Sequence, residues 1–335
     1  METKNKTAYF EWLRLFAAGA VVLMHTAANR WLSISHTVPE WEVLTWWDSL
    51  VRWPVPIFIM ITGALFLPRK TELKGMLTRY IPRMAVCYLI WSAVYNLYSG
   101  ELTLQTLASG HYHLWYLPFL CGVYLMLPFL QKIAEDDALT DQLLAVSLVI
   151  GVLIPWLVKL GLFLLPEQSA LLQTLSGMLN YSFFFDHIGL LLLGHKLHKT
   201  ALTPMQRRTL YALGLLGLSV TGCATVWATY RAEFQSSLFF DFCAPNNLFA
   251  AAALFIFAKQ HLTALPIPVA ALAKCSFGIY LSHALVIELL SDWGYHVLTW
   301  DPVWSVPVLS LVVFAISAAF TAVVRRIPGI GKFLT

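Results

Sequence analysis

The sequence predicts an all-α, polytopic membrane helical bundle of about ten transmembrane helices. Of its 335 residues, 59% are hydrophobic and only 12% are charged, whereas about a quarter of the residues of a soluble domain are charged. The mean hydropathy is +0.68, and apolar segments recur along the whole chain with short joins between them. A single integral membrane domain over residues 1–335 is therefore predicted in place of two soluble domains.

Ten segments are long and apolar enough to span a bilayer, which requires about 20 mainly apolar residues. Basic residues set the orientation, because cytoplasmic loops carry the excess of lysine and arginine. With the N-terminus inside, 17 of the 22 basic residues fall on the inner side, and only Arg30 and Arg231 fall in outer loops. Both termini are therefore predicted to be cytoplasmic. The ten segments are 8–28, 47–67, 80–99, 114–130, 143–165, 178–195, 210–230, 239–258, 276–293 and 304–324.

The rest of the composition excludes several other classes. The net charge of +4 comes from basic residues in short loops and not from one basic face, so no nucleic-acid partner is predicted. The 5 cysteines lie in apolar stretches without metal-ligand spacing, so no metal site is predicted. The first apolar run superficially resembles a signal peptide, but it is long, contains charged residues and lacks a small-x-small cleavage site before Trp31. We interpret it as a retained first helix.

The first segment contains two ionisable residues, Arg14 and His25, that a bilayer disfavours. An arginine at the centre of a span costs about 2.5–3.5 kcal/mol on insertion scales, which makes an intramembrane charge a candidate functional residue. Their spacing of 11 residues places both side chains on one helix face, about 16 Å apart along the axis. Two purely structural roles compete with a functional one: snorkelling of Arg14 to the inner surface and a polar outer helix end at His25.

Polar residues also interrupt the second segment. Arg52 precedes Pro54 and Pro56, and two prolines so close free backbone carbonyls, which a bilayer tolerates only beside protein or a wet cavity. Arg52 is therefore a candidate for a cavity mouth, and a salt bridge to Asp48 at i, i+4 is the competing interpretation. Four further polar residues are assigned to the cavity lining: Asp186, His187, Asn246 and Asn247.

Histidines and aromatic residues mark the fourth and ninth segments. His113 and Trp115 open the fourth segment within HYHLWYLPF, where an aromatic side chain either stacks on a sugar ring or belongs to the interfacial belt. Tyr280 and His283 lie at i, i+3 on one face of the ninth segment. This histidine is either a site residue or an interhelical hydrogen bonder.

These motifs resemble those of the acyltransferase-3 family of integral membrane acyltransferases, over residues 9 to about 325. The most specific one is Arg14-x10-His25, which matches the family's first-helix motif. RWPVPIFIMITGALF resembles the pattern R-x-x-x-P-x-F-F-M-I-S-G, with Thr62 in place of the serine, and HLWYL and SFGIYLSH resemble two later elements. The family's basic pair corresponds to Arg79 and Arg83, spaced one residue wider than R-x-x-R.

The resemblance implies an O-acyltransferase of the bacterial cytoplasmic (inner) membrane. It would move an acyl group, usually acetyl, from cytoplasmic acyl-CoA to a hydroxyl of a cell-envelope saccharide or lipid-linked glycan. The implied partners are acyl-CoA, this glycan and membrane lipids, with acetyl-CoA as co-substrate and no permanently bound cofactor.

The resemblance also implies roles for the candidate residues. His25 and Arg14 are the predicted catalytic residues, with His25 either a general base or a covalent acyl carrier. Because they are about 16 Å apart, the pantetheine arm must extend well into the bundle, with Arg14 holding the donor along its length. Arg14, Arg79 and Arg83 are predicted to bind acyl-CoA. The residues assigned to the acceptor are Arg52, His113, Trp115, Tyr280 and His283.

Two other classes of protein compete with an acyltransferase. A secondary transporter or glycolipid flippase also uses broken helices and intramembrane charges. The sequence shows no corresponding pair of Gly/Pro-broken segments in two halves, which argues against this class. A purely structural membrane scaffold would explain the hydrophobicity, but it does not explain why Arg14 and His25 are present in a membrane span.

Overall fold

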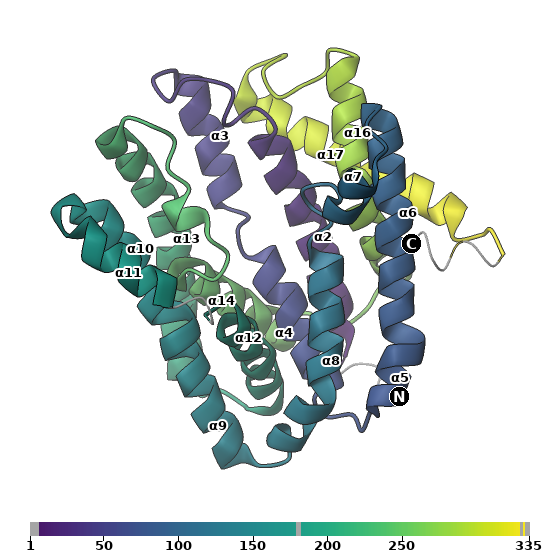
Figure 1. Ribbon diagram of the computed structural model, residues 1–335. Helices are drawn as coiled ribbons and strands as arrows, with labels where there is room; N and C mark the ends of the chain where they lie inside the picture. The colour runs from purple at the N-terminus through teal and green to yellow at the C-terminus, as the bar shows by residue number, and fades with distance from the viewer. Residues whose placement is uncertain (1–6, 179–181, 329–330, 332–335) are drawn as a thin grey trace.

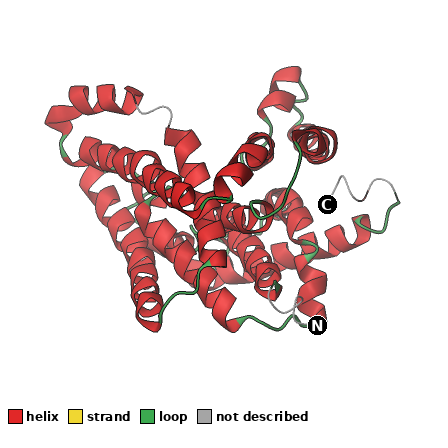
Figure 2. Ribbon diagram, turned by 90° about the horizontal axis from the view of Figure 1, so that it is seen from below, coloured by secondary structure: helices red, strands yellow, loops and turns green. Residues whose placement is uncertain are grey.

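The computed structural model describes residues 7–178, 182–328 and 331, and all regular elements within them are helical. Figure 1 shows the helices as one bundle, and Figure 2 shows it from below, with helices joined by loops and no strand among the described residues. The all-α prediction is confirmed. The main helices are α2 (Ala8–Ala28), α3 (Pro39–Ser49), α4 (Pro54–Phe66), α6 (Ile81–Ser99), α7 (Leu104–Ser109), α8 (Tyr116–Ala134), α9 (Asp137–Val146), α10 (Ile154–Leu164), α11 (Ser169–Met178), α12 (Ser182–Lys199), α13 (Pro204–Ala232), α14 (Pro245–His261), α15 (Ile267–Ala273), α16 (Ser276–Asp292) and α17 (Pro302–Val324).

Every predicted span overlaps at least one helix, and residues 179–181 of the sixth lie outside the described residues. By length and composition, 6 helical stretches of the described chain are able to cross a membrane, or 7 if the bent pair α15 and α16 forms one span. The three remaining predicted spans are α2, α6 and α12. Charged and polar residues lower the hydropathy of these three helices.

The second predicted span, 47–67, is wrong at its N-terminal end. The helix begins at Pro39 and is interrupted between Ser49 and Pro54, so the span consists of α3 and α4. Proline is favoured in the first turn of a helix, where its missing N–H costs no hydrogen bond. The interruption lies just before Pro54, and both prolines stand in the first turn of α4.

Helices α4 and α12 approach each other backbone to backbone at two glycines. A Cβ atom on Gly63 would lie 1.9 Å from the carbonyl oxygen of Leu191, and one on Gly194 would lie 2.1 Å from that of Met60. Only glycine permits such an approach, because every other residue carries a Cβ atom. The contact fixes the position of α4, whose residue Thr62 lines the cavity described below.

Helix α2 lies at the centre of the bundle. It is in contact with α3, α4, α14, α15, α16 and α17. Its buried residues Phe10, Leu13 and Ala17 belong to one apolar cluster with Ile57 of α4 and Phe255 of α14. The ionisable residues of α2 are therefore surrounded by protein on most sides.

Candidate active site

One cavity of about 250 Å³ is lined by both Arg14 and His25. Because α2 is a continuous α-helix over both positions, the predicted separation of about 16 Å along the axis holds. Helices α4, α8 and α16 form the other walls, which are largely apolar and aromatic with a few polar groups. This composition is typical of a ligand site. The lining residues are Arg14, Val21, Met24, His25, Val55, Phe58, Ile61, Thr62, Leu65, Phe66, His113, Trp115, Tyr116, Leu120, Tyr124, Ser276, Phe277 and Tyr280.

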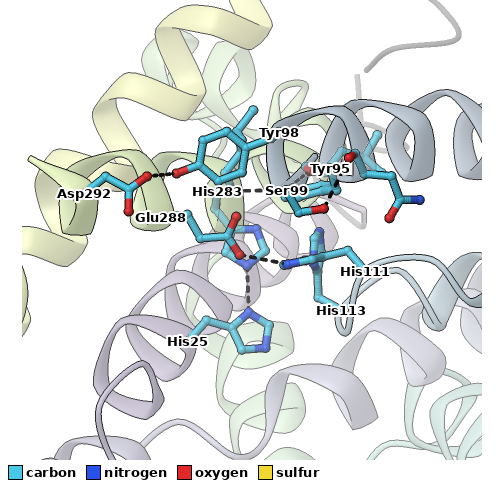
Figure 3. A network of polar contacts seen from close by, with 12 residues as sticks. His25, Tyr95, Tyr98, Ser99, His111, His113, His283, Glu288 and Asp292 are labelled. Carbon is cyan, nitrogen blue, oxygen red and sulfur yellow. Dashed lines mark hydrogen bonds and ion pairs between the residues drawn. The ribbon is translucent and has the colours of Figure 1, made fainter. Parts of the chain in front are cut away.

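His25 is hydrogen-bonded to His283 across the interface of α2 and α16 (Figure 3). Nδ1 of His25 lies 2.7 Å from Nε2 of His283. The two ring planes are inclined by 9° and their centroids are 5.0 Å apart. This separation equals the N···N distance plus the two ring radii, so the rings meet edge to edge in one plane. That is the geometry of an N–H···N hydrogen bond.

The backbone of α16 determines which of these nitrogens donates. Nδ1 of His283 lies 2.7 Å from the carbonyl oxygen of Tyr280 and 3.1 Å from that of Ile279. A carbonyl only accepts, so Nδ1 carries the proton of the neutral His283 ring, and Nε2 accepts from His25. His25 therefore donates through Nδ1 and keeps its lone pair on Nε2. A histidine in this tautomer is suited to act as a general base.

Arg14 forms an ion pair with Glu11 one turn earlier on α2. Nη1 of Arg14 lies 2.5 Å from Oε1 of Glu11, and the two side chains are 32% and 30% exposed. A guanidinium has five N–H donors, and Arg14 also lines the cavity. The arginine is thus placed to bind a polar group of a ligand that enters from the predicted cytoplasmic side.

The predicted acceptor residues His113, Trp115 and Tyr280 all line the cavity. The hydroxyl of Tyr280 donates to the carbonyl oxygen of His113. Trp115 is stacked on Phe242 with a centroid distance of 5.6 Å. His283 does not line the cavity but lies behind His25. Of these four residues, His113 and His283 have rings in contact with that of His25, and the roles of all four stay predictions.

His113 is deeply buried beside the pair of His25 and His283. It lies in the turn that precedes α8 and is 2% exposed. Burial, together with the rings of His283 and His25 beside it, lowers the pKa of His113 well below its ordinary value. Its ring contacts that of His283 edge to face, with centroids 5.0 Å apart.

Arg52 does not line this cavity. It forms an ion pair with Asp48, which is the competing interpretation of the sequence, and its guanidinium carbon lies 3.9 Å from the ring centre of Phe240. Asp48 is fully buried, and a buried carboxylate requires a cation beside it. The ion pair with Asp48 thereby explains why an arginine lies at the break between α3 and α4.

Arg79 and Arg83 lie at the start of the third span, and neither lines the cavity. The guanidinium carbon of Arg79 lies 5.7 Å from the ring centre of Tyr80, and that of Arg83 lies 5.8 Å from that of Phe277. Phe277 is a lining residue, so Arg83 is one side chain away from the cavity. Binding of acyl-CoA by this pair stays a prediction.

The assignment of Asp186, His187, Asn246 and Asn247 to the lining of this cavity is wrong. Asp186 and His187 bond to each other. The side-chain amides of both asparagines donate to the carbonyl oxygen of Phe239, at 3.0 and 3.1 Å. Asn246 also donates to the hydroxyl of Thr221 on α13 at 2.7 Å, and short polar side chains of membrane helices commonly bond between helices in this way.

The sequence analysis missed His111 and Glu288. Nε2 of His111 lies 2.8 Å from Oε1 of Glu288, and Nδ1 of His111 lies 3.0 Å from Nδ1 of His113. Glu288 lies inside the predicted span 276–293. The energetic rule that singled out Arg14 therefore applied to it as well. Among the described residues, no group of three or more His, Cys, Asp or Glu side chains is placed to hold a metal ion.

The fold and the cavity define a class: a multi-pass membrane protein with a largely apolar cavity that carries a few polar groups. The family model described as "Acyltransferase domain" matches residues 7–322. Because the match covers most of the chain, the protein belongs to the acyltransferase-3 family and is a membrane acyltransferase. Searches of curated proteins and of solved structures gave no match.

Proposed function

We propose that the protein is an O-acetyltransferase of a bacterial cytoplasmic membrane that moves an acetyl group from cytoplasmic acetyl-CoA to a hydroxyl of a cell-envelope saccharide or lipid-linked glycan. The observation that carries this proposal is the cavity that is lined by both Arg14 and His25. Membership of the family supports the acyl group. The resemblance of the motifs to the acyltransferase-3 family supports a saccharide acceptor.

The size of the cavity limits what it holds. Its volume of about 250 Å³ is below the range of about 300–1,000 Å³ that encloses whole ligands. The cavity therefore accommodates the reacting ends of the two substrates, the acetyl thioester with part of the pantetheine arm and the acceptor hydroxyl. The remainder of each substrate lies outside it.

The reaction then follows from the tautomer of His25. The acceptor hydroxyl donates to Nε2 of His25 while its oxygen attacks the thioester carbonyl carbon, and the proton passes to His25 as the new C–O bond forms. The C–S bond breaks, and His25 returns the proton to the departing thiolate, so that an ester and the free thiol of CoA result. His283 holds the ring of His25 in this tautomer, as the third member of a catalytic triad does. Arg14 holds the donor from the cytoplasmic side.

Transfer of labelled acetyl groups tests this proposal. The purified protein is supplied with radiolabelled acetyl-CoA and envelope glycolipid extracts, and wild type is compared with His25→Ala. The matched control is His261→Ala, at the exposed end of α14. We expect transfer by wild type and by the control, and a loss of at least about 10²-fold in His25→Ala, the usual contribution of a general base.

Each alternative outcome has a defined meaning. If wild type moves no label to any acceptor fraction, the proposed function is wrong. Equal transfer by His25→Ala would show that His25 is not the base. Label trapped on His25 without acceptor would identify a covalent acyl-histidine. Substrate uptake into vesicles without release of CoA would indicate a transporter.

A further inference from the structure

A second chain of hydrogen bonds leads from a carboxylate to the histidines of the site (Figure 3). Oε1 of Glu288, on α16, lies 2.8 Å from Nε2 of His111. Nδ1 of His111 lies 3.0 Å from Nδ1 of His113. The ring of Tyr95 lies flat on that of His111, with centroids 4.1 Å apart and an interplanar angle of 7°. The chain is thus held in place by α6, α16 and the turn that precedes α8.

The direction of the protons in this chain follows from Glu288. A carboxylate only accepts, so Nε2 of His111 carries a proton and donates it to Glu288. In the neutral ring, Nδ1 of His111 then accepts from Nδ1 of His113. The other ring nitrogen of His113, Nε2, is buried. The negative charge of Glu288 thereby polarises His111 and His113 in turn.

Among the described residues, no carboxylate is hydrogen-bonded to His25 or His283 themselves. His283 is held by two backbone carbonyls, and these do not balance a full positive charge. The ring of His113 contacts both members of the pair, with centroid distances of 6.2 Å to His25 and 5.0 Å to His283. The chain from Glu288 therefore ends at His113, whose ring contacts the two histidines that share a positive charge when His25 takes a proton.

A nearby carboxylate provides a comparison. Asp292 lies one turn after Glu288 on α16, but it accepts from the hydroxyl of Tyr98 and not from a histidine. Within residues 7–178, 182–328 and 331, Glu288 is the carboxylate hydrogen-bonded to this group of four histidines, His25, His111, His113 and His283.

We propose that Glu288 supplies the counter-charge of the reaction. It is a positioning residue that acts through His111 and His113 and stabilises the positive charge gained by the His25–His283 pair during removal of the proton from the acceptor hydroxyl. This inference rests on the proposed O-acetyltransferase function. It predicts that the charge of Glu288, and not only its hydrogen bond, sets the rate of the chemical step.

The test compares two substitutions of Glu288 with one of Asp292. Glu288→Gln keeps an oxygen that accepts from His111 but removes the charge, and Glu288→Ala removes both. For acetyl transfer with saturating acceptor, we expect Glu288→Gln to lower kcat about tenfold or more with the KM for acetyl-CoA unchanged, because the stabilised charge develops only in the transition state. Asp292→Asn, the matched control, should retain the kcat of wild type.

A double substitution separates this role from a structural one. His111→Phe keeps an aromatic ring against Tyr95 but interrupts the chain, so adding Glu288→Gln to it should cause no further loss of kcat. A wild-type kcat in Glu288→Gln, or losses that multiply in the double variant, would overturn the inference while leaving the proposed function intact. If wild type transfers no acetyl group to any acceptor, the proposed function fails and this inference fails with it.

Discussion

The contact between α4 and α12 leads to a prediction about Gly63. In Gly63→Ala the new Cβ atom would meet three backbone atoms of Leu191 at 1.9, 2.6 and 2.7 Å. Ordinary van der Waals contact begins at 3.4 Å, so the two helices must separate by about 1.5 Å at this point. A rotamer change gives no relief, because the atoms that clash belong to the backbone.

The magnitude follows from two opposing effects. Overpacking costs about 1–3 kcal/mol and occasionally more, and alanine regains up to about 1 kcal/mol of helix propensity over glycine. We expect a net loss of stability of about 1–2 kcal/mol. The shift also moves the neighbouring Thr62 in the cavity wall, and a misplacement of about 1 Å can reduce catalysis about 10²-fold.

Thermal unfolding and acetyl transfer of the detergent-purified protein measure both effects. Gly122→Ala in α8 is the matched control, because a Cβ atom there has no heavy atom within 4 Å. The control should keep full activity and at least the wild-type melting temperature. A Gly63→Ala protein as stable and as active as this control would refute the close packing of α4 on α12.

Three further substitutions test other parts of the structure. His283→Phe should lower kcat by about 10²-fold or more with the KM for acetyl-CoA unchanged, because the tautomer of His25 is no longer fixed; an unchanged kcat would contradict the pairing. Arg14→Lys keeps the charge but loses the planar fork of donors, so steady-state kinetics should show a KM for acetyl-CoA raised about tenfold or more; an unchanged KM would separate Arg14 from the donor. Lys259→Met removes hydrogen bonds of 2.7, 2.7 and 2.8 Å to three carbonyl oxygens that end α12 and should cost about 1.5–3 kcal/mol in chemical unfolding, with no such cost for the exposed Lys132→Met.

The sequence alone predicted those parts of the site that depend on one helix. Arg14 and His25 share a face because of the period of the α-helix, and the continuous α2 confirms the geometry. The break before Pro54 follows from the chemistry of proline. For Arg52, local spacing already offered the partner Asp48, and the structure selected this alternative over the cavity mouth.

Contacts between distant segments could not be predicted in the same way. His25 and His283 are 258 positions apart, and His111 and Glu288 are 177 apart. Hydropathy states that each helix is apolar, but not which of its faces meets which neighbour. Asn246 and Asn247 show the consequence. They are as polar as the residues of the site, but their side chains bond to the carbonyl oxygen of Phe239 and do not line the cavity.

The sequence by itself determined the membrane class, the helical segments and the Arg14–His25 stripe, because hydropathy and helical period are local properties. Only the tertiary structure decided that His25 is paired with His283 and that Glu288 is connected to His113 through His111. The physical reason is packing: the contact of α2 with α16 sets which side chains lie within hydrogen-bond distance. The tautomer of His25, on which the proposed chemistry depends, is a product of that packing.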